Sequence, residues 1–353
     1  MSRIAVVLFN LGGPDRPAAV EPFLFNLFND PAIIGLPAPL RWPLAKLISR
    51  RRAPIAREIY AELGGGSPLL PNTEAQARAL EAKLNAESRG EVWRCFIAMR
   101  YWHPRSEQAA EKVKAYAPDK IVLLPLYPQF STTTVASSVA DWDAAARKTG
   151  LAAETRSVCC YPDDSGFVNG VAAKAAEALR AAQREGPVRL LFSAHGLPKK
   201  VVAGGDPYQW QVELSAAAVT RRLAELDPGW SDLDTVVCYQ SRVGPLEWIG
   251  PSTDDEVVRA GRDGVAVVLV PIAFVSEHSE TLVELDVEYA KLAKEKGVRA
   301  YHRVPTVDDQ DDFVAGLARL ARQAVEGSDR VCSSRGGRLC PDGLGRCRYR
   351  LAA

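Results

Sequence analysis

Short apolar runs alternate with longer amphipathic stretches along most of the chain. Apolar runs bounded by Gly, Pro and Asp predict eight β-strands, over Ile4 to Phe9, Val92 to Ala98, Ile121 to Leu126, Glu154 to Cys160, Val188 to Ser193, Thr235 to Tyr239, Val265 to Pro271 and Val298 to Val304. Most of these runs are uniformly apolar, which is typical of strands buried on both faces of a parallel sheet. Apolar residues at spacings of three and four predict helices between them, over Thr73 to Glu87, Ser106 to Tyr116, Gly166 to Arg184, Gln209 to Leu226 and Glu280 to Lys296.

The residues that punctuate these strands repeat once, in the same order. VVLFNLGGP, CFIAMR, VLLPLYPQFS and CCYPDD in the first half are echoed by LLFSAHGLP, VCYQSR, VVLVPIAFVSE and RVPTVDD in the second. Strands that alternate with helices form doubly wound parallel sheets. We therefore predict an α/β fold with two similar parallel sheets of four strands each, flanked by helices and facing a shared cleft.

The repeat also predicts the domain boundaries. The first domain is expected to span residues 1–160 and the second 161–305, with a separate tail over 331–353. The final predicted helix, Gln310 to Val325, follows the second half and is expected to pack back on the first, which adds about 306–330 to the first domain. A length of 353 residues fits this division, because one core usually serves about 150 residues.

Composition limits the classes of partner and the cellular compartment that we expect for this chain. A net charge of +1 with 25% charged residues favours neither a nucleic-acid surface nor a disordered tail, so small molecules are the expected partners. No apolar run reaches the roughly 18 residues of a membrane span, and MSRIAVVLFN lacks a signal-peptide cleavage site, so we expect a cytoplasmic location. Seven cysteines, an odd number, indicate reduced thiols or metal ligands rather than a disulfide framework. The oligomeric state stays open.

Two of the four histidines stand where a predicted buried strand gives way to a loop. VRLLFSA runs into His195, and VAVVLVPIAF runs into the segment VSEHSE that contains His278. Open α/β sheets bind their ligands at the carboxyl ends of their strands, which makes a chemical role the leading interpretation. The alternative is a core histidine bonded to backbone. An imidazole with a pKa near neutrality can remove a weakly acidic proton or ligate a metal.

Carboxylates follow His278 along the next predicted helix. Glu280, Glu284 and Glu288 recur at spacings of four, which places them on one helical face. Like charges at this spacing repel each other, so a cation or a proton path would compensate. A solvated acidic face is the alternative. In the first half of the repeat, Leu11 occupies the place of His195 and FSTTT that of SEHSE, so the reactive groups belong to the second half.

The segment over residues 21–52, which we call the lip, is unusually apolar for a surface segment. It carries many Phe, Leu and Ile side chains and Trp42 among five prolines, and it ends in Arg50, Arg51 and Arg52. One interpretation is a helical hairpin that covers the core. The other is an apolar lip over a large hydrophobic ligand, with a basic rim that could contact anionic lipid at a membrane surface.

The tail predicts a metal centre. Cys332, Cys340 and Cys347 lie in the run CSSRGGRLCPDGLGRC, and thiolates select zinc or iron-sulfur clusters. A four-thiolate centre needs one further ligand from the body of the protein, and Cys159 or Cys160 is the candidate, at a strand end. The spacing is wider than in most structural zinc sites. Incidental tail cysteines are the alternative.

Seven motifs in this sequence resemble those of the ferrochelatase family. They are NLGGP at Asn10 to Pro14, GGGSPL at Gly64 to Leu69, MRYWHP at Met99 to Pro104, LYPQFSTTT at Leu126 to Thr134, SAHGLP at Ser193 to Pro198, CYQSRVGPLEWIGPST at Cys238 to Thr253 and FVSEHSETLVELDVEY at Phe274 to Tyr289. The resemblance extends over essentially residues 3–325. It implies two Rossmann-like domains of the class II chelatase type that bind no nucleotide, and insertion of ferrous iron into protoporphyrin IX to give protohaem.

The resemblance also implies roles for individual residues. His195 and Glu280 match the active-site residues of the family and would meet the ferrous substrate, while Glu284 and Glu288, together with His278, would relay protons or iron. Ser67, Arg100 and Tyr101 match residues that line the porphyrin pocket, to which Leu11 adds apolar surface. The wide tail spacing, with Cys159 or Cys160, resembles bacterial members that carry a 2Fe-2S cluster, whereas Thr132 stands where the animal pattern has its fourth cysteine.

Other functions remain as alternatives at this point. A cobalt or nickel chelatase acting on another tetrapyrrole would use the same reaction type. A non-enzymatic tetrapyrrole carrier or an iron-sulfur binding protein would need no acidic relay. A nucleotide-dependent oxidoreductase is disfavoured, because the sequence lacks G-x-G-x-x-G after its first strand.

Overall fold

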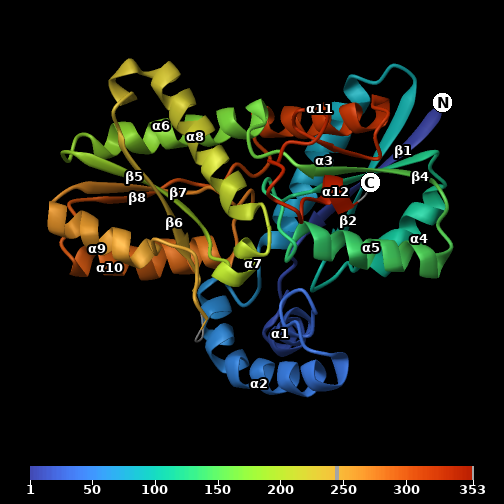
Figure 1. The fold of residues 1–353 in the computed structure, drawn as a ribbon, viewed down its shortest axis with the longest axis horizontal. Helices are drawn as coiled ribbons and strands as arrows, with labels where there is room; N and C mark the ends of the chain where they lie inside the picture. The colour runs from blue at the N-terminus through green and yellow to red at the C-terminus, as the bar shows by residue number, and fades with distance from the viewer. Residues whose placement is uncertain (243–245, 352–353) are drawn as a thin grey trace.

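Two parallel sheets lie side by side in the computed structural model, and a helical hairpin projects from the body near their junction (Figure 1). The structure describes residues 1–242 and 246–351. The first sheet contains β1 (Ser2–Asn10), β2 (Glu91–Met99), β3 (Lys120–Pro125), β4 (Glu154–Cys160) and β9 (Val331–Ser333). The second contains β5 (Val188–His195), β6 (Asp234–Gln240), β7 (Ala266–Pro271) and β8 (Tyr301–Arg303).

The strand orders confirm the repeat. The first sheet runs β2-β1-β3-β4-β9 and the second β6-β5-β7-β8, so the first four strands of each half occupy equivalent places. All eight predicted strands are present, although Val298 to Val304 is reduced to Tyr301–Arg303. The prediction of four strands in each sheet was wrong for the first sheet, because the tail adds β9 beside β4. Sequence patterns gave no sign of β9, a strand of only three residues in a Gly-rich and Arg-rich segment.

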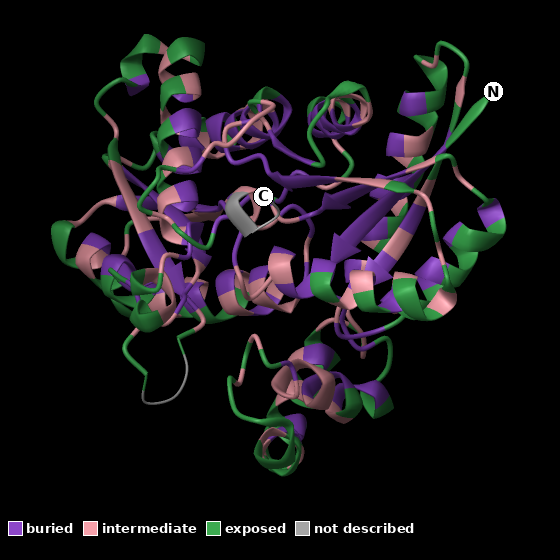
Figure 2. Cartoon of the chain, turned by 45° about the vertical axis from the view of Figure 1, so that its right-hand side comes forward, coloured by how far each residue is buried: buried purple, intermediate pink, exposed green. Residues whose placement is uncertain are grey.

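Helices cover both faces of the sheets, and the strands between them are buried (Figure 2). The α-helices outside the hairpin are α3 (Leu69–Ala86), α4 (Ser106–Tyr116), α5 (Val135–Thr149), α6 (Ser165–Ala182), α7 (Lys199–Ala203), α8 (Tyr208–Leu226), α9 (Thr253–Asp263), α10 (Ala290–Glu295), α11 (Asp311–Glu326) and α12 (Arg348–Leu351). Short 3-10 turns precede α1 and follow α8, at Pro17–Ala19 and Pro228–Trp230. Helix α11 packs on α3, β3 and β4 as well as on α6, so it lies against the first sheet.

The helix predicted over Glu280 to Lys296 has an unexpected form. Its first ten residues, η3 (Glu280–Tyr289), form a π-helix, and α10 follows directly. A π-helix closes its hydrogen bonds over five residues instead of four, and such turns occur mostly at functional sites. The apolar spacing predicted the helix but not this wider form, because both forms bring residues four apart onto neighbouring turns.

The projecting hairpin consists of α1 (Val20–Phe28) and α2 (Ala38–Glu62), joined by a short loop, and it contains the whole of the lip. Its base is buried, where Phe23, Leu24, Ala53 and Tyr60 pack with Tyr101 and Trp102. Its outer part is exposed, including Leu40 at 61% and Trp42 at 56%. The hairpin therefore covers core only at its base and presents apolar side chains at its end.

In the part of the chain that the structure describes, no helix is long and apolar enough to cross a bilayer.

Candidate active site

Loops from the carboxyl ends of the first sheet pack tightly against one another. Gly13, just after β1, approaches Ser67 so closely that a Cβ on Gly13 would lie 2.4 Å from the Ser67 hydroxyl. The Ser67 backbone N–H donates to the Pro14 carbonyl at 2.7 Å. The segment after β2 joins the same group, since Tyr101 N–H donates to the Leu11 carbonyl at 2.9 Å. The NLGGP, GGGSPL and MRYWHP motifs thus form one rigid surface.

His195 is the last residue of β5, where the strand ends at the junction. Its Nδ1 lies 2.7 Å from the Gly196 carbonyl oxygen. A carbonyl can only accept, so Nδ1 carries the proton and the lone pair belongs to Nε2. Nε2 faces Glu280 Oε2 at 4.0 Å, and the imidazole is 41% exposed. A fixed tautomer with a free Nε2 suits an imidazole that accepts a proton or ligates a metal.

Glu280 begins the π-helix opposite His195. Its Oε2 is buried and has no hydrogen-bond partner among the described residues. A buried carboxylate oxygen without a donor is costly, which is typical of a functional site. His278 lies two residues before it and is buried, with Nδ1 3.2 Å from the Ser276 carbonyl oxygen and its ring against Phe274. Burial lowers the pKa of His278, although Glu280 opposes this effect.

Glu284 lies one turn further along η3 and is half-buried. It accepts from the Ser241 N–H at 2.9 Å and the Ser241 hydroxyl at 2.6 Å. Burial and the nearby Glu280 carboxylate raise the pKa of Glu284 to about 7. Glu288 is exposed at the outer end of the same segment. The exposure of the three glutamates therefore increases along the segment, from half-buried Glu280 and Glu284 to Glu288 at its solvent end.

The first half of the chain holds the loop that precedes Glu280. Gln76 on α3 is fully buried, and its Nε2 donates to the carbonyls of Val275 at 2.8 Å and Asp308 at 2.9 Å. The base of the hairpin reaches the same loop, because the hydroxyl of Tyr60, near the end of α2, is hydrogen-bonded to Ser279. Burial raises the pKa of Tyr60 to about 12. The site is thus assembled from both halves.

Arg100 and Tyr101, expected beside a porphyrin, are engaged by a buried carboxylate. Asp30, in the loop between α1 and α2, accepts from Arg100 Nη2 at 2.8 Å and from the Tyr101 hydroxyl at 2.8 Å. Ser137 on α5 donates to the same Asp30 oxygen. Arg100 and Tyr101 therefore attach the lip to the first sheet, whereas Leu11 and Ser67 are partly exposed near the loops described above.

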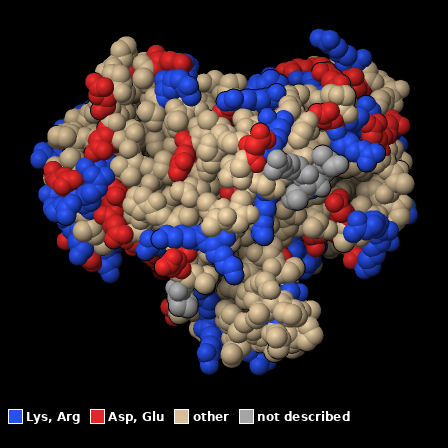
Figure 3. Space-filling view, viewed as in Figure 1, with Lys and Arg blue, Asp and Glu red and all other residues tan. Residues whose placement is uncertain are grey.

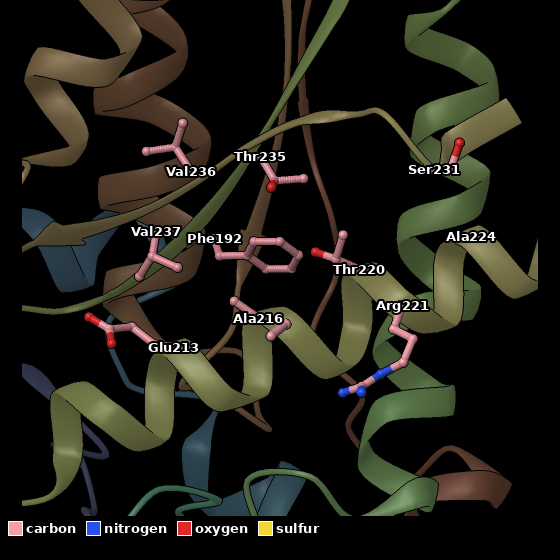
Figure 4. A pocket seen from close by; sticks show the side chains of 11 residues that line it. Phe192, Glu213, Ala216, Thr220, Arg221, Ala224, Ser231, Thr235, Val236 and Val237 are labelled. Carbon is pink, nitrogen blue, oxygen red and sulfur yellow. The ribbon is translucent and has the colours of Figure 1, made fainter. Parts of the chain in front are cut away.

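Two cavities of appreciable size lie away from these residues. One of ≈ 590 Å³ lies between α8 and β6 and is lined by Phe192, Glu213, Thr220, Arg221 and Val237 (Figure 4). The other, of ≈ 480 Å³, lies between α4 and α5 beside His103. Neither includes His195 or Glu280.

The tail brings buried thiols together beside the end of β4. Cys159 and Cys160 have sulfur atoms 3.2 Å apart, and Cys160 and Cys347 are both hydrogen-bonded to Cys340. Hydrogen bonds from Cys160, Cys347 and Gln211 lower the pKa of the Cys340 thiol. Cys332 lies on β9, opposite Val158 of β4, and its side chain packs into the larger core cluster. Within residues 1–242 and 246–351, no three His, Cys, Asp or Glu side chains stand in an arrangement ready to hold a metal ion.

Several residues of the site carried no signal in the sequence. Asp30, Gln76 and Asp206 are buried polar residues that belong to no periodic pattern or sequence motif. Their side chains are hydrogen-bonded to residues that lie far away in the sequence. Asp206 accepts from Thr132 N–H at 2.7 Å and from the Ser131 hydroxyl at 3.0 Å. Only the packing of the folded chain brings such partners together. Of the motif at Cys238 to Thr253, residues 243–245 lie outside the described residues.

Comparisons with known proteins identify the family of the chain. The family model for ferrochelatase matches residues 3–325. Ferrochelatase from Caulobacter vibrioides (strain NA1000 / CB15N) is 54% identical over 351 residues, which are 99% of each chain. Ferrochelatase from Phenylobacterium zucineum (strain HLK1) is 55% identical over 348 residues, 99% of this chain and 98% of that one. The structure of SirB from Bacillus subtilis with Fe³⁺ matches with a TM-score of 0.52 at 11% identity, over 92% of this chain and 96% of that one.

The two parallel sheets flanked by helices form a two-domain, Rossmann-like chelatase fold. The chain belongs to the ferrochelatase family. It is a lyase that inserts ferrous iron into protoporphyrin in haem synthesis, and the alternative of another tetrapyrrole chelatase is not favoured.

Proposed function

We propose that His195 and Glu280 exchange the two pyrrole protons of protoporphyrin IX for ferrous iron. The observation that carries this proposal is the geometry of the pair. His195 Nε2 lies 4.0 Å from Glu280 Oε2, and this carboxylate oxygen has no hydrogen-bond partner among the described residues. Nε2 takes a pyrrole proton or holds the entering ion, and the carboxylate stabilises the imidazolium that results from proton transfer. Solving the porphyrin complex tests this, and pyrrole nitrogens remote from both side chains would contradict it.

Protons that reach Glu280 need a route away from the ring. Glu284 is suited to carry them, since burial raises its pKa to about 7 and allows it to gain and lose a proton near neutrality. Glu288 and His278 are the further candidates for this relay, or for the path of iron. Saddling of the ring, driven by contacts with apolar walls, would expose the nitrogen lone pairs to this chemistry.

The porphyrin itself would lie between the loops of the first half and the catalytic pair. Leu11 and Ser67 are the residues proposed to contact the ring. Arg100 and Tyr101 are hydrogen-bonded to Asp30 and would support this surface from within the fold. The domain division proposed for this arrangement is residues 1–160 with about 306–330, then 161–305, then the tail over 331–353.

The lip is also proposed to touch the inner face of the cytoplasmic membrane, where a hydrophobic product or substrate would be exchanged. Figure 3 shows its largely uncharged end bordered by Lys and Arg. Five exposed apolar side chains of the lip support this role, namely Ile33, Leu36, Leu40, Trp42 and Leu47, and Ile55 lies just beyond them on α2. An apolar patch with a basic rim is typical of interfacial binding.

Replacing Leu40 with aspartate should weaken binding to anionic phospholipid vesicles by about tenfold, because an exposed Leu loses its burial in lipid. Cosedimentation with phosphatidylglycerol vesicles measures the effect. Leu226→Asp serves as the control, since Leu226 is 42% exposed at the end of α8 and lies outside the lip. Equal binding by both variants would remove the lip from membrane contact.

We further propose that the tail holds a 2Fe-2S cluster. The chemistry of the donors suits such a group, because Cys340, Cys347, Cys332, Cys159 and Cys160 are all buried, unbridged thiols, although the described residues do not hold three of them ready around one point. Arg338 lies beside Cys340 and would offset the charge of thiolates. When bound, the cluster supplies one-electron chemistry and cross-links the tail to the first sheet.

Changing Cys340 to serine should abolish the visible absorption of the freshly purified protein and lower its Tm by about 5 °C or more, because a structural metal centre couples to folding. Absorption spectra, iron analysis and thermal unfolding measure these effects. Cys95→Ser is the control, since Cys95 lies on β2 far along the sheet from the tail. A colourless wild-type protein containing zinc would contradict the cluster.

A further inference from the structure

The catalytic helix carries a second polar route that leaves from its inner face. Tyr289 is the last residue of η3, and its ring is 5% exposed among Leu191, Leu285 and neighbouring apolar side chains. Its hydroxyl lies 3.4 Å from Glu284 Oε1 and 3.3 Å from Asp254 Oδ2. One buried hydroxyl thus stands between a half-buried carboxyl group and a second carboxyl group.

Asp254 provides the outer end of this route. It lies in the first turn of α9, and it is exposed to solvent. Glu284 provides the inner end, held by Ser241 and close enough to Glu280 for the Glu280 charge to raise its pKa. Glu284, Tyr289 and Asp254 therefore connect the catalytic junction to water through hydrogen-bonding groups alone.

We propose that Tyr289 and Asp254 form the exit of the proton relay, so that protons from Glu284 leave through the Tyr289 hydroxyl to Asp254. This inference rests on the proposed function, in which Glu284 carries pyrrole protons. In this proposal the protons leave the row of glutamates at Glu284 and reach solvent through Tyr289, at the end of η3.

The transfer conserves protons and charge at every atom. A proton moves from the Glu284 carboxylic acid to the Tyr289 hydroxyl oxygen while the proton of that hydroxyl moves to the Asp254 carboxylate. Glu284 is left as a carboxylate, Tyr289 as a neutral phenol and Asp254 as a carboxylic acid, which releases its proton to water. No phenolate forms, which matters because burial raises the pKa of Tyr289 far above its usual value.

Tyr289→Phe in the full-length protein tests the hydroxyl while keeping the ring in its packing. Steady-state turnover with protoporphyrin and ferrous iron should show kcat reduced about tenfold, because a positioned proton-transfer group contributes at least this much. The KM for protoporphyrin should change less than about twofold, and the solvent deuterium isotope effect on kcat should increase.

Tyr301→Phe is the matched control. The Tyr301 hydroxyl donates to the Leu285 carbonyl at 2.8 Å, so this variant loses a hydrogen bond to the same helix without interrupting the route. Its kcat should stay within about twofold of the wild type. Equal kcat values for the two tyrosine variants would overturn the inference, since the Tyr289 hydroxyl would then be only structural.

Two further variants separate the possible failures. Asp254→Asn keeps a polar side chain but cannot take up a proton, and wild-type turnover in this variant would remove Asp254 from the exit. Glu284→Gln tests the relay on which the inference rests. Wild-type turnover in Glu284→Gln would overturn the relay itself, whereas reduced turnover there with unaffected Tyr289→Phe would overturn only the exit.

Discussion

Replacing His195 with alanine is expected to lower kcat for iron insertion by about 10³-fold, within the range that a positioned acid-base group contributes. The Gly196 carbonyl fixes Nδ1 as the protonated nitrogen, so Nε2 is the only imidazole atom free to meet a pyrrole proton or the metal ion. Alanine removes that lone pair and leaves Glu280 without its partner. Haem formation followed by absorbance, with porphyrin affinity measured by fluorescence quenching, provides the test.

Porphyrin binding should persist in this variant, because the surface proposed to hold the ring belongs to the loops of the first half, including Leu11 and Ser67. His103→Ala is the control, since His103 lies before α4 and contacts Gln108 at the surface. Its turnover should match the wild type. Retained iron insertion by the His195 variant would remove the imidazole from the mechanism.

The Glu280→Gln variant should lose about 10²-fold in kcat, because an amide can neither accept a proton nor stabilise an imidazolium as a carboxylate does. The unpartnered Oε2 atom is the group concerned. The amide is nearly the same size as the carboxylate, so the fold should be preserved. Turnover assays and the Tm of the same preparation separate a chemical effect from a structural one.

Asp286→Asn offers a control on the same π-helix. Asp286 forms an ion pair with Arg303 at 2.6 Å, so its loss should lower stability without a comparable change in kcat. Should Glu280→Gln behave like Asp286→Asn, with lower Tm but normal kcat, the carboxylate would belong to the scaffold and not to the reaction.

The sequence was sufficient for the main plan of the fold. Continuous apolar runs indicate the buried strands, and the repeated loop motifs predict that the two halves share one arrangement of strands. The same patterns located His195 at a strand end and Glu280 on the helix that follows His278, and the structure places these two side chains 4.0 Å apart. Periodicity could not distinguish η3 from an α-helix, because it reports which residues face the core and not which carbonyl each N–H selects.

Contacts between distant single residues escaped prediction for a different reason. Asp30 meets Arg100 across 70 positions of sequence, and Tyr289 meets Asp254 across 35. Neither pair has a spacing that repeats or a motif that marks it. Such partners are determined by how elements pack in space, which local propensities do not encode.

Strand β9 has a consequence beyond the thiol that it carries. It pairs with Ser157, Val158 and Cys160 of β4, so it covers the carboxyl-terminal part of that edge of the first sheet. An uncovered strand of this kind is a template for pairing with another molecule, and leads to aggregation. Peeling away β9, by proteolysis or by loss of the bonds that retain it, would expose β4 to self-association. The cysteine-bearing tail would then also protect the protein from aggregation.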